Sequence, residues 1–116
     1  MDSKEKNYSA ARAAHKALDD KFGQDIVTLD ISKISILSDF FVIASGNNPS
    51  QIKAMADAAS EAVEKLGLKL RHTEGSHSSS WFLLDFGGVI IHIFYRDERN
   101  FYGLERIWGD AEVVTF

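Results

Sequence analysis

Residues 74–108 read EGSHSSSWFLLDFGGVIIHIFYRDERNFYGLERIW, and this stretch decides the fold. Its two apolar runs, Trp81–Phe86 and Val89–Tyr95, are rich in the aromatic and β-branched residues that favour strands. Gly87–Gly88 separates the runs, and such a link is typical of tight hairpins because both glycines can take positive φ. The sequence therefore predicts an antiparallel hairpin in which Phe86 lies opposite Val89.

This register gives the hairpin two different faces, because side chains alternate along a strand and cross-strand partners share a face. One face is apolar and is predicted to be core: Phe82, Leu84, Phe86, Val89, Ile91 and Ile93. The other face, called the mixed face below, carries Trp81, Leu83, Asp85, Ile90, His92 and Phe94, with Ser79 and Arg96 at its end.

Two interpretations of the mixed face compete. In the first, a helix covers it, Asp85 accepts hydrogen bonds from a neighbouring turn, and His92 is a satisfied core histidine, since both would be costly in a dry core without partners. In the second, the edge of the face is an interaction surface, because Trp, Tyr and Arg dominate interface energetics. The following segment, predicted as a short helix from Asn100 to Trp108, supplies more such side chains: Arg99, Tyr102 and Trp108.

Hydrophobic periodicity predicts the elements before the hairpin. Residues spaced by three or four form the stripe of an amphipathic helix closed by Gly23: Tyr8, Ala11, His15, Leu18 and Phe22. Ile26–Ile31 alternates, with Val27, Leu29 and Ile31 on one side. Phe40–Ala44 is nearly all apolar, as expected for an inner strand of a sheet that is covered on both faces.

A second helix is predicted after this strand. Asn48 can cap it, Pro49 fits its first position, and Gln51 completes a box-like pattern. Its buried stripe is Ile52, Met55, Ala56, Ala59, Val63 and Leu66, and Gly67 ends it. Leu68–Thr73 is predicted as a further strand and Ala111–Phe116 as a tail. The chain is thus expected to be an α/β domain with a mixed sheet of about five strands and flanking helices.

Length and composition restrict the classes of protein. A chain of 116 residues is expected to form a single domain over 1–116, and without cysteine it has no disulfide framework or zinc–sulfur site. No apolar run approaches the ~20 residues that span a bilayer, and the N-terminus resembles no signal peptide, so a cytoplasmic location is expected. The net charge is −4 and the 13 Lys and Arg residues are scattered, which disfavours nucleic acid and favours a basic partner such as a ribosomal protein.

Motifs of catalysis are weak. Gly46-Asn47-Asn48 follows a predicted strand, where phosphates often bind, but no further glycine follows at fingerprint spacing. His72, Glu74 and His77 are close in sequence but lack helical spacing and a further ligand, so we expect no metal site. The carboxylate pair of a nucleotidyltransferase is absent from the end of a central strand, since Asp110-Ala111-Glu112 lies near the terminus. We expect neither an enzyme nor a cofactor.

Several motifs together resemble the ribosomal silencing factor S family, also called the Iojap family. The resemblance runs from about Ala10 to Trp108. The residues that carry it are Asp30-Ile31, Ser38–Gly46, Gln51, Ala54, Glu74-Gly75, Trp81–Gly87, His92–Phe94, Arg99 and Phe101–Trp108. Departures are mild: Phe40 and Phe86 stand where tyrosine is common.

The resemblance implies a fold related to nucleotidyltransferases but without their catalytic carboxylates. It also implies binding to large-subunit ribosomal protein fourteen, which blocks joining of the small subunit and represses translation when nutrients are short. A large-subunit assembly factor, or a residual nucleotide-binding or nucleotidyltransferase-like activity, is the alternative, and the oligomeric state stays open, a homodimer included. The residues predicted to bind the partner are Trp81, Leu83, Asp85, His92, Phe94, Arg99, Tyr102 and Trp108.

Overall fold

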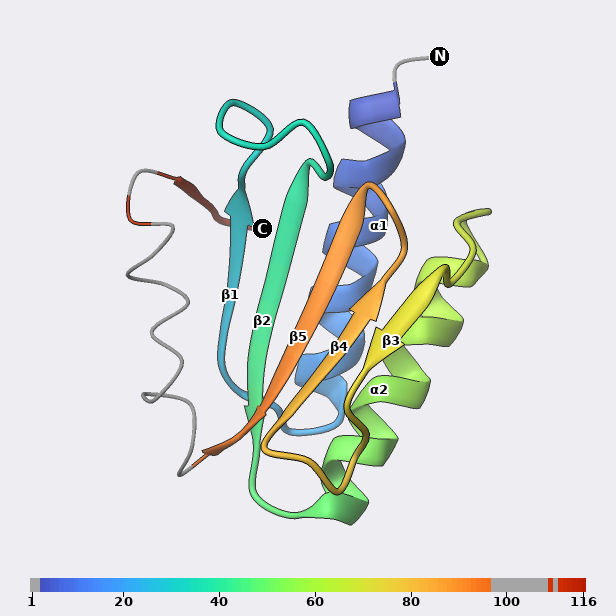
Figure 1. The fold of residues 1–116 in the computed structure, drawn as a ribbon, viewed down its shortest axis with the longest axis vertical. Coiled ribbons are helices and arrows are strands. Elements are labelled where there is room, and N and C mark those ends of the chain that lie inside the picture. The colour runs from blue at the N-terminus through green and yellow to red at the C-terminus, as the bar shows by residue number, and fades with distance from the viewer. Residues whose placement is uncertain (1–2, 97–108, 110) are drawn as a thin grey trace.

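The computed structural model describes residues 3–96, 109 and 111–116 (Figure 1). Its elements are α1 (Ser3–Asp20), β1 (Gln24–Asp30), β2 (Phe40–Gly46), α2 (Pro49–Glu64), β3 (His72–Glu74), β4 (Trp81–Asp85), β5 (Val89–Tyr95) and β6 (Glu112–Val114). The predicted α/β fold is confirmed. No helix in the described ranges is both long and apolar enough to cross a membrane.

The strands form one six-stranded sheet in the order β3-β4-β5-β2-β1-β6. Among the described strands, the central pair of β2 and β5 is parallel and the other pairings are antiparallel. The sequence predicted about five strands because β6 lies in the segment interpreted as a tail. This strand has three residues and is recognisable by its pairing with β1, in which Val114 lies opposite Thr28.

The helices α1 and α2 lie side by side against the same face of the sheet (Figure 1). The layer between them and the sheet is the main core, and its sheet side includes the predicted core face of the hairpin. Leu84, Val89 and Ile91 are fully or almost fully buried there. The prediction that helices flank the sheet is therefore confirmed for one face.

The hairpin has the predicted register. Leu84 lies opposite Ile91 and Phe82 opposite Ile93, and the Phe86 amide donates to the Val89 carbonyl at 2.9 Å. Of the two linking glycines, Gly87 takes a positive φ of 86°. One positive φ at the first turn position is enough to reverse the chain between twisted strands.

The first helix differs from its prediction in its buried stripe and in its end. Its buried residues are Ala10, Ala11, Ala14 and Leu18. Tyr8 is 40% exposed at the rim, and Phe22 lies beyond the helix and is 81% exposed. The residue that takes the left-handed conformation is Phe22, with φ 63°, and the Gly23 amide then donates to the Leu18 carbonyl. The small alanines explain the difference, because they let the helix approach its neighbours closely.

The second helix begins as predicted. The Asn48 side chain accepts from the Gln51 amide at 2.8 Å, and Pro49 is the first helical residue. The predicted stripe is buried except for Leu66, which is 41% exposed after the helix ends at Glu64. Gly67 takes a positive φ of 93°. The strand predicted over Leu68–Thr73 is formed only at His72–Glu74, on the edge of the sheet.

Candidate functional site

The mixed face of the hairpin lies on the side of the sheet that α1 and α2 do not cover (Figure 1). A second apolar cluster forms there, and its buried residues are Leu29, Ile31, Phe41, Ile43 and Phe94. Trp81 and Ile90 pack against this cluster and are only partly buried. Among the described residues, the side of the sheet opposite the two helices therefore has an apolar base with partly exposed large side chains on it.

Aromatic rings occupy the centre of this face. Trp81 stacks on Phe94, its cross-strand neighbour, with ring centroids 5.3 Å apart. His92 lies edge-on to Phe41 at 4.6 Å and is 5.7 Å from Trp81. Aromatic pairs at such separations stabilise each other beyond the area that they bury. Trp81 is therefore held in place by two neighbours on β5, Phe94 and His92.

A hydrogen bond fixes the same tryptophan. The indole Nε1–H of Trp81 donates to Nδ1 of His92 at 3.1 Å, so the neutral imidazole carries its proton on Nε2. That Nε2 is buried, and no acceptor in the described ranges lies within hydrogen-bonding distance of it. Burial lowers the pKa of His92 to about 3. The imidazole is neutral at physiological pH and serves as an acceptor for Trp81.

Asp85 closes the turn of its own hairpin. Its Oδ1 accepts from the Gly87 amide at 2.7 Å, as the first interpretation of the mixed face predicted for this carboxylate. Asp85 is only partly buried and lies opposite Ile90, at the edge of the mixed face. Asp85 therefore has a structural contact and still reaches the surface.

The predicted site residues differ in exposure. His92 is 3% exposed and Phe94 is fully buried, whereas Trp81, Leu83 and Asp85 are partly exposed. The structure therefore brings five of the eight predicted residues together on one face, in two layers: His92 and Phe94 beneath, the other three nearer the surface. The remaining predicted residues lie outside the described ones: Arg99, Tyr102 and Trp108.

The contribution of β1 and β2 to this face was not predicted as part of the site. Phe41 touches His92, and Leu29 and Ile43 extend the apolar base sideways from the hairpin onto β1 and β2. The alternation of Val27, Leu29 and Ile31 was the available signal, but the sequence does not show which strand lies beside β5. The parallel pairing of β2 with β5, in which Ile43 lies opposite His92, decides it.

Other candidate chemistry has simpler explanations in the structure. Nε2 of His72 lies 2.6 Å from Glu74 Oε1, an exposed pair at the edge of the sheet. In the described ranges no three His, Cys, Asp or Glu side chains are grouped so as to hold a metal ion. Asp39 accepts from the Asn7 side chain at 2.9 Å, a contact within the fold.

Comparison with known proteins places the chain in a family. The family model described as "Ribosomal silencing factor during starvation" matches residues 3–116. The chain belongs to this family. It is 39% identical to ribosomal silencing factor RsfS of Bacillus subtilis, covering 91% of this chain and 90% of the relative. It is 37% identical to RsfS of Halalkalibacterium halodurans, covering 93% and 92%.

A solved structure and a chloroplast protein are also similar to this chain. A crystal structure of a protein from Chromobacterium violaceum superposes with a TM-score of 0.81 at 33% identity, covering 94% of this chain and 88% of the other. The chloroplastic Iojap protein of Zea mays is 32% identical over 91% of this chain, which spans 46% of that relative. The family consists of ribosome-associated regulators of translation, and the predicted membership is confirmed.

Proposed function

We propose that this protein binds the large ribosomal subunit through ribosomal protein fourteen and prevents the small subunit from joining. Translation would then be repressed when nutrients are limiting. Membership of the ribosomal silencing factor family is the observation that carries the proposal. The side of the sheet opposite α1 and α2, with its partly exposed tryptophan, supplies a surface of the right kind.

The contact is proposed to centre on Trp81 and Leu83. Trp81 is stacked on Phe94 and bonded to His92, so little side-chain freedom remains to be lost when a partner binds. A rigid aromatic side chain near the centre of an interface is the usual binding hot spot. We therefore assign His92 and Phe94 the role of positioning Trp81 rather than of touching the partner.

Exclusion by bulk is a sufficient mechanism. A domain of this size can cover ~800 Å² of its partner, a standard interface. If that patch lies where the two subunits meet, the small subunit cannot approach. The proposal requires no reaction and no cofactor, in agreement with a family of regulators and not of known enzymes.

Charge complementarity supports a basic protein as the partner. The net charge of this chain is −4, and ribosomal proteins are typically basic. Association should be faster at low ionic strength, with a shallower salt dependence than for a protein that binds many phosphates. A slope of log affinity against log salt as steep as that of a DNA-binding protein would contradict this choice of partner.

The test is co-sedimentation with purified ribosomal subunits, followed by titration against isolated large-subunit protein fourteen. We expect retention on the large subunit only, and a loss of at least about tenfold in affinity for Trp81→Ala. Leu83→Ala should also weaken binding. Leu66→Ala is the matched control, because this exposed leucine follows α2 on the helical side of the molecule. Equal retention on small subunits would overturn the proposal.

The same assay separates silencing from assembly. A silencing factor should bind mature large subunits and lower the yield of joined ribosomes when small subunits are added. An assembly factor should bind precursor large subunits and leave mature ones. Preference for precursors, with no effect on joining, would replace the proposed function by that alternative.

A further inference from the structure

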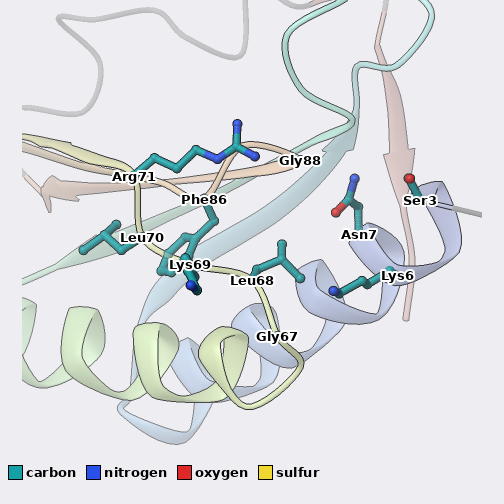
Figure 2. A pocket seen from close by; sticks show the side chains of 10 residues that line it. All are labelled: Ser3, Lys6, Asn7, Gly67, Leu68, Lys69, Leu70, Arg71, Phe86 and Gly88. Atoms are coloured by element: carbon teal, nitrogen blue, oxygen red, sulfur yellow. The ribbon is translucent and has the colours of Figure 1, made fainter.

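A cleft of about 680 Å³ lies on the helical side of the hairpin turn (Figure 2). Three parts of the chain form it: the start of α1, the connection between α2 and β3, and the turn between β4 and β5. Its polar lining includes Lys6 and Asn7 from α1 and Lys69 and Arg71 from the connection. Leu68 and Phe86 form its apolar floor and are buried.

The cleft is basic in an acidic protein. Among the residues that the structure describes, three cationic side chains line it and no Asp or Glu does. In the described ranges the ion pairs of Lys4, Lys53 and Lys65 each join a lysine to a carboxylate, but none includes Lys6, Lys69 or Arg71. The cleft therefore carries about three positive charges that the neighbouring side chains do not neutralise.

Glycines let two of these cations lie directly against the backbone. A Cβ on Gly67 would be 3.1 Å from Lys6 Nζ, and a Cβ on Gly87 would be 2.8 Å from Arg71 Cζ. Both glycines have positive φ, so other residues would be strained there. Figure 2 shows Arg71 extending toward the Gly88 end of the cleft and Lys6 extending from α1.

Neutral donors engage the carboxylates of Asp39 and Asp85. Asp39 accepts from the Asn7 side chain at 2.9 Å, and Asp85 accepts from the Gly87 amide at 2.7 Å. In the part of the chain that the structure describes, neither forms an ion pair with a cation of the cleft. An arginine fork and two lysine ammonium groups around one cleft are the side chains that proteins use to bind phosphate.

We propose that this cleft binds a phosphate-bearing anion, with Lys6, Lys69 and Arg71 as its ligands. Three cations match the charge of a di- or triphosphate group, and the cleft lies within the size range of small-molecule sites. Unlike a nucleotidyltransferase site, it neutralises phosphate with cations and needs no magnesium or carboxylate pair. Because the cleft lies on the helical side of the sheet, its occupation is separate from contacts on the mixed face.

The test is calorimetric titration of the purified protein with inorganic triphosphate, without divalent metal and at constant ionic strength. We expect saturable binding with one site per chain. Arg71→Gln and Lys6→Gln should each weaken it at least about fivefold, equivalent to about 1 kcal/mol for one exposed charged contact. The matched control is Lys53→Gln, which removes the same charge from an exposed lysine on α2 and should leave the affinity within about twofold.

Two competitors identify the source of the phosphate. Displacement of triphosphate by a nucleoside triphosphate at lower concentration than by a short single-stranded RNA supports a free nucleotide, and the reverse order supports an RNA backbone. Absence of saturable binding below about 1 mM would overturn the proposal. Equal weakening by Lys53→Gln and Arg71→Gln would also overturn it, because that result would mean attraction by overall charge. Melting temperatures within a few degrees of the parent protein exclude unfolding as the cause.

Discussion

The indole of Trp81 reaches diagonally across the hairpin to His92, whose direct cross-strand neighbour is Leu83. Its N–H donates to the imidazole Nδ1 at 3.1 Å, and this bond selects the tautomer of the histidine. Protonation of Nδ1 would place two donors opposite each other. The orientation of the partly exposed tryptophan therefore depends on a neutral imidazole beneath it.

Stability should fall in acid because of this histidine. The pKa of His92 is about 3 when folded, below its ordinary value of 6.5, because burial disfavours the charged form. Between these two pKa values the unfolded chain binds a proton at His92 that the folded chain does not. The contribution of His92 to the free energy of unfolding is therefore complete above about pH 6.5 and is lost as pH falls toward 3. We expect His92→Gln to flatten the curve of unfolding free energy between pH 6 and 4 by about 1.4 kcal/mol per pH unit.

The control for this measurement is His15→Gln. Burial also lowers the pKa of His15. The His15→Gln variant should therefore lose the part of the pH dependence of stability that His15 causes and keep the part that His92 causes. Denaturant melts over the pH range provide the measurement, and an unchanged slope in His92→Gln would contradict the prediction.

Two residues of β4, Leu84 and Trp81, can distinguish a role in folding from a role in binding. Leu84 is 3% exposed in the main core, so Leu84→Ala should cost about 2–5 kcal/mol of stability. Trp81→Ala should cost less, because Trp81 is only partly buried, although it loses its bond to His92. Denaturant melts compared with partner titrations provide the check. If both variants melt equally badly, Trp81 is core and the proposed contact must lie elsewhere.

Gln51 should contribute more to stability than its surface position indicates. Its Oε1 accepts from the Asn47 amide at 2.7 Å, and its Nε2 donates to the carbonyls of Lys21 and Phe22. It thereby fastens the start of α2 to the end of α1. We expect Gln51→Ala to cost about 1–2 kcal/mol in a denaturant melt.

Gln51→Glu is the informative partner of that variant, because it keeps the acceptor for Asn47 and loses both donated bonds. Gln51→Glu should lower the free energy of unfolding by at least half as much as Gln51→Ala does. Lys53→Ala, two residues along the same helix, is the surface control and should change stability by less than about 0.5 kcal/mol. A Gln51→Ala protein as stable as this control would show that the bonds between the helices contribute nothing.

Phe22→Gly should stabilise the protein. Phe22 takes φ 63° and is 81% exposed, so it bears the strain of a left-handed residue without the benefit of burial. Glycine is the preferred residue at this place after a helix, and we expect a gain of about 0.5–1 kcal/mol. Phe22→Ala keeps the strain and should give no such gain. Equal melting midpoints for the two variants would contradict the explanation.

The hairpin was predictable in detail because its signals are local. The Gly87–Gly88 link sets the register, and strand alternation then assigns every side chain from Trp81 to Phe94 to a face. The cap of α2 was equally predictable, since Asn48 and Gln51 act on neighbouring backbone. Fold class followed from the order of such segments.

The features that the sequence did not predict depend on contacts between distant segments of the chain. The edge strand β6 is defined by its pairing with β1, and three residues are too few to show a pattern. The stripe of α1 was shifted because alanines, weak signals of burial, form its buried side while Phe22 points outward. The basic cleft was missed since Lys6 and Arg71 come together only in the folded chain.

The parallel pairing of β2 with β5 has a consequence for synthesis of the protein. Residues 40–46 cannot pair with residues 89–95 until those later residues have been synthesised. The centre of the sheet therefore cannot form until most of the chain has left the ribosome. Pairings between such distant segments are slow because the intervening loop must close first. Until then β2, which is entirely buried in the finished protein, can pair with β1 but keeps one apolar edge unpaired, and that edge is a point of aggregation. Truncated or stalled chains that end before Val89 are therefore expected to be insoluble.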